Sequence, residues 1–249
     1  MIKSVIIVAA GSSSRMGGKV RKPYLKLRGK PILTWTVAAL SKLSGLKQIV
    51  LVTRPEDRKR AAAAAKLAKI PKSVRLDFAD GGARRQDSVF NGLNVTLPEA
   101  ELVLIQDAAR PFPKKETMEH ACDAAMELGA SILACRVKDT VKKESGNTWQ
   151  MAGDKASGTR HEALTLETVP RAGLWLAQTP QIFRRILILE LFARLMGESP
   201  DKEVTDDASI CELFGHPVAL VESSETNFKV TRPEDLAIAE AYLKLGLVK

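Results

Sequence analysis

The sequence predicts an α/β fold, in which helices cover a mostly parallel sheet and one antiparallel β-arm protrudes from it. Short apolar runs rich in β-branched residues alternate with helix-like segments over most of the 249 residues. The first run, Val5–Val8, leads directly into the small residues 9–14, as a buried parallel strand leads into a loop. A polar stretch at residues 139–168 interrupts the alternation and predicts the arm.

The first half of the chain alternates regularly between the two kinds of segment. A helix opened by Pro31 and stopped by Gly45, an alanine-rich helix ending before Pro71 and a helix stopped by Gly129 lie between the expected strands. The five expected strands are Val5–Val8, Gln48–Val52, Val74–Phe78, Leu102–Gln106 and Ser131–Val137.

The second half is less regular. The polar stretch contains strand-like pieces at Val141 and Leu164–Leu166, which predict a hairpin with a partly ordered middle. After it we expect an apolar helix at Arg184–Met196, a short helix capped by Val204–Asp207 and a last core strand at Pro217–Val221.

The pentapeptide Thr-Arg-Pro-Glu-Asp occurs twice, at residues 53–57 and 231–235. Each copy combines a capping residue with a proline at the first turn, which predicts a capping box that opens a helix. We see no larger internal repeat, so the simplest interpretation is that the same helix start is used twice.

The positive charge is concentrated at one end of the chain. Residues 1–55 contain 11 Lys and Arg and no Asp or Glu, whereas the whole chain has 38 basic and 29 acidic residues. A polybasic tract and an RNA-binding motif are absent and aromatic content is 5%, so we expect no nucleic-acid partner. The longest apolar run near the N-terminus, Val5–Ala10, is too short for a membrane span or a signal peptide, and the cysteines show no paired spacing. We therefore expect a cytoplasmic protein.

The loop after the first strand has the composition of a phosphate-binding loop. Backbone N–H groups of small residues can approach phosphate oxygens closely, and Arg15, Lys19 and Lys22 supply positive charge. The loop matches neither a Walker A sequence nor a dinucleotide fingerprint, because Met16 stands where each requires glycine. An ordinary polar turn with solvated lysines remains the alternative.

Two further loops lie at the same predicted edge of the sheet, where open α/β sheets bind ligands. Gly82, Arg85 and Ser88 follow the third strand and could hold a base and a ribose. Asp107 follows the fourth strand as either a Mg²⁺ ligand or a helix N-cap. Arg110 and Lys229 are candidates for a second phosphate, with surface solvation as the alternative.

The three histidines, His120, His161 and His216, lie outside these loops, and neither a serine-hydrolase elbow nor a zinc-hydrolase motif occurs. Acyl transfer and zinc hydrolysis are therefore poorly supported. Phosphate chemistry by charge and positioning remains.

Several motifs, in order from Val5 to Leu243, resemble those of the 2-C-methyl-D-erythritol 4-phosphate cytidylyltransferase family. They are AAGSSSRM with Lys22, GGARRQDSVFNGL, DAARP, KDTVK, PRAGLWLAQTPQIF, TDDAS and NFKVTRPEDLAIAE. Three features depart from the family pattern: Arg21-Lys22-Pro23 replaces Pro-Lys-Gln, Gln106 replaces a histidine, and the arm is longer. Because Pro23 lacks an N–H group, the path of the chain near Lys22 is an open question.

The resemblance implies a single nucleotidyltransferase domain over residues 1–249, Rossmann-like and of the nucleotide-diphospho-sugar transferase type, with residues 139–178 as a dimerisation arm. It implies that CTP and 2-C-methyl-D-erythritol 4-phosphate give the CDP-alcohol and pyrophosphate in non-mevalonate isoprenoid biosynthesis, with Mg²⁺ as cofactor and a homodimer as the assembly. The roles it implies are catalysis by Arg15, Lys22, Arg171 and Lys229; CTP binding by Ala10, Gly11, Gly82, Arg85 and Ser88; substrate binding by Asp107, Arg110, Thr140 and Thr179; and Mg²⁺ binding by Asp107.

In the resemblance, Arg171 and Thr179 reach the substrate from a partner subunit. A cytidylyltransferase for another polyol phosphate, such as ribitol 5-phosphate, is the nearest alternative, and DAARP favours the first family. A non-enzymatic nucleotide-binding module is a remote alternative.

Overall fold

The structure, a computed structural model, describes residues 1–11, 20–150 and 162–248. Its contacts divide the chain into two compact units, residues 1–134 with 177–249 and residues 135–176. Each unit is described by itself below.

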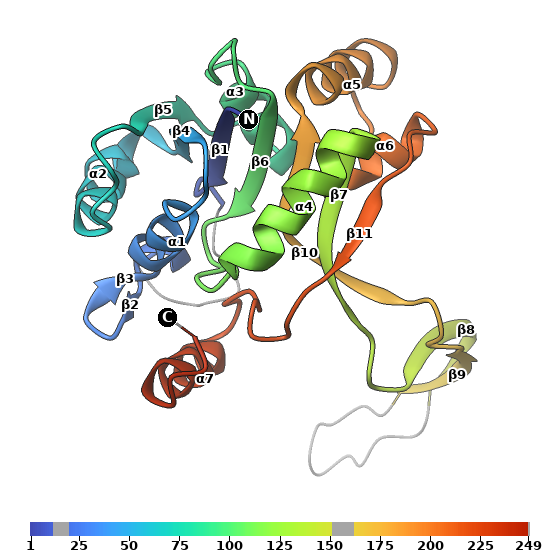
Figure 1. Ribbon diagram of the computed structural model, residues 1–249. Coiled ribbons are helices and arrows are strands. Elements are labelled where there is room, and N and C mark those ends of the chain that lie inside the picture. The colour runs from blue at the N-terminus through green and yellow to red at the C-terminus, as the bar shows by residue number, and fades with distance from the viewer. Residues whose placement is uncertain (12–19, 151–161, 249) are drawn as a thin grey trace. The chain divides into compact units, whose positions relative to one another are not determined.

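A seven-stranded sheet forms the centre of the first unit (Figure 1), in the order β11-β7-β10-β6-β1-β4-β5. β1 pairs in parallel with β4 and β6, β4 with β5, and β7 with β11, whereas β10 runs antiparallel to β6. The predicted mostly parallel α/β sheet is therefore confirmed. Its strands are β1 (Lys3–Val8), β4 (Leu46–Thr53), β5 (Arg75–Asp80), β6 (Leu102–Asp107), β7 (Ala130–Arg136), β10 (Trp175–Arg184) and β11 (Ala219–Glu222).

Helices pack on both faces of this sheet, as alternating side chains of a buried parallel strand require. Val5 and Ile7 of β1 pack in a core with α1, α2 and α4, while Ile6 packs in a second core with α3, α5 and α6. No described helix has the length and apolar character needed to cross a bilayer. The helices are α1 (Ile32–Leu40), α2 (Arg58–Leu67), α3 (Arg85–Leu93), α4 (Lys115–Leu128), α5 (Arg185–Glu198), α6 (Ala208–Leu213) and α7 (Pro233–Lys244).

A third, smaller core joins the two ends of the chain. The short strands β2 (Lys26–Leu27) and β3 (Lys30–Pro31) pair, and Leu27 packs with Val230 and Ala239, which precede and belong to α7. The backbone N–H of Val230 donates to the carbonyl of Ala109, 2.9 Å away, just beyond β6. The segment before α7 is thereby brought to the end of the central sheet.

The second unit contains the predicted hairpin. β8 (Val141–Gln150) pairs antiparallel with β9 (Glu162–Val169), with Val141 opposite Val169, so this prediction is confirmed. At its base the Arg136 guanidinium lies 4.3 Å from the centre of the Trp175 ring, a cation–π contact. The partly ordered middle that the sequence predicts lies mostly at residues 151–161, outside the described residues.

Two sequence expectations about strands require correction. The segment expected as a last core strand is β11, at the edge of the sheet. Its side chains alternate between half-buried and exposed, because one face packs on the core that contains α4. Conversely, no strand was expected in the centre between β6 and β7, yet β10 lies there with Ile182 and Phe183 fully buried. β10 was not predicted because its sequence lacks a continuous run of β-branched residues.

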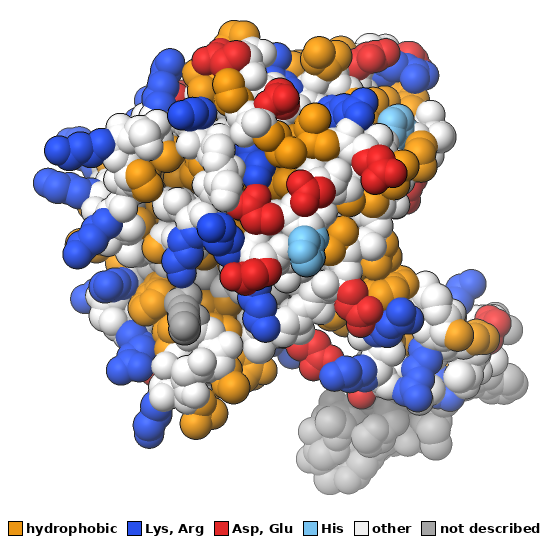
Figure 2. Space-filling model, viewed as in Figure 1, with side chains coloured by type: hydrophobic (Ala, Val, Ile, Leu, Met, Phe, Trp, Pro, Cys, Tyr) orange, Lys and Arg blue, Asp and Glu red, His pale blue; other side chains and the backbone are white. Residues whose placement is uncertain are grey.

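The cysteines, all among the described residues, form no disulfide, and the charged side chains are unevenly distributed over the surface. Cys122, Cys135 and Cys211 are buried free thiols, and burial raises the pKa of Cys122 to about 11 and of Cys211 to about 12. Figure 2 shows Lys and Arg gathered over the side of the first unit that carries α2 and the β2–β3 hairpin, and acidic side chains over α4. The cytoplasmic location stays a prediction.

Candidate active site

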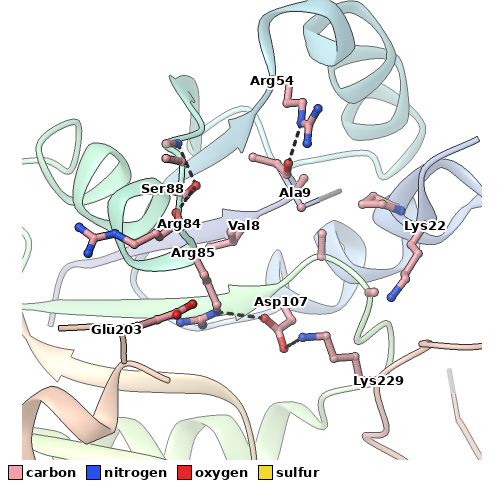
Figure 3. Close-up of a pocket in the computed structure, with 17 residues that line it drawn as sticks. Val8, Ala9, Lys22, Arg54, Arg84, Arg85, Ser88, Asp107, Glu203 and Lys229 are labelled. Carbon is pink, nitrogen blue, oxygen red and sulfur yellow. Dashed lines mark hydrogen bonds and ion pairs between the residues drawn. The ribbon is translucent and has the colours of Figure 1, made fainter. Parts of the chain in front are cut away.

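A pocket of about 450 Å³ lies at the carboxyl end of β1 and β6 (Figure 3). Its walls come from the end of β1 with Ala9–Gly11, the turn at Lys22, the start of α3, the residues after β6, and Lys229. All of these belong to the first unit. The described part of the first loop, Ala9–Gly11, therefore meets the other two predicted loops at one edge of the sheet, because β1 pairs in parallel with β4 and β6, and β4 with β5.

The two glycines after β5 allow the second loop to lie against the first. A Cβ atom at Gly81 would be 2.3 Å from Cβ of Ala10, and one at Gly82 would be 2.3 Å from Cβ of Asp87. The hydroxyl of Ser88 accepts the N–H of Gly82 at 3.0 Å and is 3% exposed. Ser88 thus shapes the loop from within, while the exposed backbone of Gly82 faces the pocket.

Lys22 occupies a one-turn 3₁₀ helix, η2 (Lys22–Tyr24). The turn is closed by backbone hydrogen bonds from Tyr24 N–H to Arg21 O, 2.9 Å, and from Leu25 N–H to Lys22 O, 3.2 Å. Pro23 fits at the first turn of such a helix, where its missing N–H costs nothing. The open question about the chain path near Pro23 is therefore answered: the chain forms a short helical turn, and Lys22 lines the pocket.

Asp107 is the acidic centre of the pocket, and three basic side chains converge on its carboxylate. The Lys229 amino group lies 2.9 Å from Oδ2, the Arg110 Nε 3.5 Å from Oδ2 and the Arg85 Nε 3.8 Å from Oδ1. Burial opposes ionisation, but these positive charges outweigh it and hold the pKa of Asp107 well below its usual range. The alternative role as a helix N-cap is excluded, since α4 begins only at Lys115.

Arg85 is held in place by a carboxylate that the sequence analysis assigned only to helix capping. Its Nη1 and Nη2 donate to Asp207 Oδ1 and Oδ2 at 2.9 and 2.7 Å, and the Asp207 side chain is fully buried. Asp206 does cap α6, by accepting the N–H of Ser209 at 3.0 Å. The consecutive aspartates of TDD therefore have separate tasks, and only the long-range partner of the second was unpredictable.

Thr179 lies in β10 behind Asp107, 5% exposed. Its hydroxyl accepts the backbone N–H of Asp107 at 3.0 Å, and its carbonyl accepts the amide of Asn227 at 3.0 Å. Gln106, at the position of the family histidine, donates to the carbonyl of Arg110 at 2.9 Å. Thr179 and Gln106 thus fix the backbone around Asp107 within the same chain.

The structure brings together most, but not all, of the predicted site residues. Ala10, Gly11, Lys22, Gly82, Arg85, Ser88, Asp107 and Lys229 line the pocket, with Arg110 against Asp107. Arg15 lies outside the described residues. Thr140 and Arg171 are exposed in the second unit, where Arg171 donates to the carbonyl of Lys138.

Outside the predicted loops, the charged residues Arg54 and Glu203 line the pocket without a site prediction from the sequence. Arg54 follows β4 and donates from Nε to the carbonyl of Ala10 at 3.0 Å, while Glu203 comes from the loop before α6. Both side chains reach the pocket from distant segments, and no local motif marks them.

The pocket can bind a polyanion, and comparison with known proteins agrees. Residues 3–245 match the family model "IspD: 2-C-methyl-D-erythritol 4-phosphate cytidylyltransferase". The chain belongs to this family. It is 39% identical over 96% of its length to the 2-C-methyl-D-erythritol 4-phosphate cytidylyltransferase of Geobacillus thermodenitrificans, covering 95% of that protein. It is 38% identical over 97% to that of Pelotomaculum thermopropionicum, covering 94%.

Another relative is longer than this chain. The chain is 38% identical to the "Bifunctional enzyme IspD/IspF" of Desulfotalea psychrophila over 97% of its own length, but it spans only 56% of that protein.

Solved structures of the same family share the fold. The chain superposes with a TM-score of 0.77 and 28% identity on 4-diphosphocytidyl-2C-methyl-D-erythritol synthase from Anaerococcus prevotii, covering 98% of this chain and 96% of that one. The TM-score is 0.71, with 32% identity and coverage of 98% and 100%, for 2-C-methyl-D-erythritol 4-phosphate cytidylyltransferase from Thermus thermophilus. The family and the nucleotidyltransferase fold that the sequence predicted are therefore confirmed.

Proposed function

We propose that the chain joins CTP and 2-C-methyl-D-erythritol 4-phosphate to give 4-diphosphocytidyl-2-C-methyl-D-erythritol and pyrophosphate, a step of isoprenoid biosynthesis. The observation that carries this proposal is the convergence of Lys22, Arg85 and Lys229 on a pocket whose other wall is a loop of small residues. Such a pocket offers backbone donors and fixed positive charge to phosphates.

CTP occupies the side of the pocket formed by the first two loops. Ala10 and Gly11 face the triphosphate, and Gly82 offers its backbone to the base, with Ser88 holding the loop and Arg85 at the phosphate end. The close packing of Gly81 on Ala10 leaves little width between the loops, which favours one ring over two. We therefore expect CTP to be preferred over ATP and GTP.

The attacking group is a phosphate oxygen of the substrate, which is already ionised at neutral pH. A new bond forms between this oxygen and the α-phosphorus of CTP, while the bond from that phosphorus to the bridging oxygen breaks and pyrophosphate leaves with the electron pair. No general base is required. Of the histidines that the structure describes, His120 and His216, neither is among the residues lining the pocket.

In this mechanism, positively charged side chains provide the catalysis. Negative charge builds up on the non-bridging oxygens of the α-phosphate as the nucleophile adds, and preorganised cations stabilise it. Lys22 and Arg15 take this role by the family correspondence. The nearly complete burial of Lys22, 9% exposed, supports it because low exposure strengthens the interaction with developing charge.

The substrate phosphate and alcohol bind beyond Asp107. Lys229 and Arg110 flank the Asp107 carboxylate, so a phosphate entering here finds two cations already gathered by one carboxylate. By the family correspondence, Thr140 is a further candidate for substrate binding.

Asp107 is suited to bind the expected Mg²⁺ together with the phosphate oxygens of a nucleotide, as a single carboxylate ligand. Mg²⁺ with nucleotides is commonly held by one or two carboxylates together with phosphate oxygens. The carboxylate of Asp107 is a hard donor that opens on the pocket with 12% of its side chain exposed, and the described residues include no group of three or more His, Cys, Asp or Glu able to hold a metal by themselves. Bound with CTP, the ion would neutralise phosphate charge.

The arm supports a proposal about assembly. An isolated hairpin is only marginally stable in water, and β9 carries an exposed Leu166. We expect a homodimer in which Arg171 reaches the partner's substrate phosphate, opposite Lys229. The expectation that Thr179 also serves the partner's site is corrected, because its hydroxyl is buried against Asp107 of its own chain. The variants Arg171→Ala and Lys229→Ala should each be nearly inactive, and mixing them under subunit exchange should restore activity in one site per heterodimer. Verified exchange without recovery, or an active monomer, would contradict the shared site.

The function itself is tested by measuring pyrophosphate release for each nucleotide triphosphate paired with each polyol phosphate. We expect release with CTP and 2-C-methyl-D-erythritol 4-phosphate far above every other pair. Preference for ribitol 5-phosphate would assign a different substrate to the same chemistry, and CTP binding without release would leave only a nucleotide-binding module.

A further inference from the structure

Arg21 stands directly before Lys22 and is one of the departures of this chain from its family's pattern. The turn that carries Lys22 spans only three residues, and one of them, Pro23, has no N–H group to donate. Two backbone hydrogen bonds leave the orientation of so short a turn dependent on side-chain contacts. Tyr24 supplies one of these by packing in the core that contains residues of α1 and α2, and Arg21 supplies another.

The Arg21 side chain provides such an anchor. Its Nη1 donates to Oδ2 of Asp57, and its Nη2 donates to Oε1 of Glu56 at 2.8 Å. The side chain of Asp57 is 4% exposed and that of Arg21 21%, so the pair is largely shielded from water. The hydrogen bond with Glu56 raises the pKa of Arg21, which keeps the guanidinium charged. A rigid fork that engages two carboxylates fixes direction as well as distance.

The segment that receives Arg21 also touches the nucleotide side of the pocket. Arg54, three residues before Asp57, donates to the carbonyl of Ala10 at 3.0 Å, and the N–H of Ala9 donates to the carbonyl of Val52 at 2.8 Å. Residues 52–57 therefore contact both the small-residue loop and the Lys22 turn. Figure 3 shows the Arg54 side chain pointing to the loop beside Ala9. Lys22 lies on the other side of this loop, in the same part of the pocket.

We propose that Arg21 is a positioning residue for Lys22: anchored on Glu56 and Asp57, it holds the Lys22 turn in a fixed relation to the loop at Ala10. This inference rests on the proposed function, in which Lys22 stabilises charge on the α-phosphate. Arg21 itself contacts neither the pocket nor the reacting atoms, because its guanidinium is turned to Asp57.

A double-mutant cycle tests the inference. Arg21→Met keeps the apolar stem and removes the fork, and we expect it to lower kcat roughly 10- to 100-fold with little change in KM for CTP, as loss of a supporting contact commonly does. In the Lys22→Ala background the same change should lower kcat no further. Arg21→Lys, which cannot engage both carboxylates, should recover only part of the loss. Arg58→Met is the matched control, since Arg58 pairs with Asp80 on the surface at 2.6 Å, and should leave kcat unchanged.

A second readout does not depend on turnover. The labelling rate of the Lys22 amino group by a small acylating reagent, followed by mass spectrometry, should be low in the parent protein and several-fold higher in Arg21→Met, as expected for a buried group whose turn is released. Equal labelling in both proteins, or a drop in kcat of the same factor with and without Lys22, would overturn the inference. If the parent protein releases no pyrophosphate from any pair, the proposed function fails, and the labelling rates still decide whether Arg21 holds Lys22.

Discussion

Residues 53–57 and 231–235 have the same five amino acids and put their aspartates to different uses. In the second copy, Asp235 accepts hydrogen bonds from the backbone N–H groups of Thr231 and Arg232 at 2.6 and 2.9 Å and from the Thr231 hydroxyl at 2.9 Å. These hydrogen bonds all lie at the start of α7, so the motif serves to begin this helix. It is a capping box as predicted, with Arg232 rather than Thr231 at the N-cap position.

In the first copy the buried aspartate lies 3.7 Å from Arg60 of the following helix and also receives a side chain from a distant part of the chain. Asp57 receives Arg21, no side-chain cap is made at the short 3₁₀ helix η3 (Pro55–Asp57), and the Thr53 hydroxyl is buried without a partner among the described residues. The predicted capping box at residues 53–56 is therefore wrong. The difference teaches that a cap sequence fixes where a helix begins, whereas the partner of its acidic side chain depends on what another part of the chain brings near.

The largest expected effect comes from removing the anchor in the first copy. Asp57→Ala leaves the Arg21 guanidinium short of one partner, and we expect a loss of about 1–3 kcal/mol in the free energy of unfolding together with a fall in kcat. Denaturant unfolding and steady-state kinetics measure both. Asp80→Ala is the control: its carboxylate pairs with Arg58 while 60% exposed, so stability should change by no more than about 0.5 kcal/mol. Unchanged kcat in Asp57→Ala would remove the distinction between the copies.

The corresponding change in the second copy should be smaller and confined to stability. Asp235→Ala removes a helix cap, which costs about 1 kcal/mol. Since Asp235 bonds only within its own helix start, kcat should stay at the wild-type value. A large loss of activity here would show that the second copy also supports the site, through Lys229 and Val230.

The pH dependence sharpens the same comparison. Burial opposes ionisation of Asp235, but the hydrogen bonds from Thr231 and Arg232 outweigh it and lower its pKa from the ordinary value of 3.8. Its stabilising effect is therefore complete above that ordinary value and is lost as the pH falls through the lower pKa of the folded state. The stability difference between wild type and Asp235→Asn should be constant near neutral pH and shrink in acid below 3.8. A difference that grows in acid would contradict this sign.

The smallest effect distinguishes the two threonines. Thr231→Val removes a hydroxyl that donates to Asp235, and should cost about 1 kcal/mol. Thr53→Val replaces a buried hydroxyl, for which the described residues provide no hydrogen-bond partner, by a methyl group, so stability should be unchanged or slightly increased. Thermal unfolding of the two variants side by side is sufficient. Equal losses would mean that Thr53 has a partner in solution.

The comparison also explains how much could be predicted from the sequence. Strands with continuous apolar runs, such as β1 and β6, and loops that directly follow them were predictable, because strand position and loop chemistry are local properties. Asp107, at the end of β6, was predicted in this way, whereas Gly82 was predicted from the alternating strand before it and Lys22 from the basic residues around the first loop. The partners Asp57 for Arg21, Asp207 for Arg85 and Thr179 for Asp107 were not, because 36, 122 and 72 residues separate them and only the folded sheet brings them together.

The central claim is that fixed positive charge, and Lys22 in particular, stabilises the transition state of cytidylyl transfer. Steady-state kinetics of Lys22→Ala with CTP and 2-C-methyl-D-erythritol 4-phosphate test it most directly, with the exposed Lys26→Ala as control. We predict a kcat about 10²- to 10³-fold below wild type, about 2.7–4 kcal/mol, with KM for CTP nearly unchanged. An unchanged kcat with a raised KM for CTP would contradict the claim and leave Lys22 as a binding residue only.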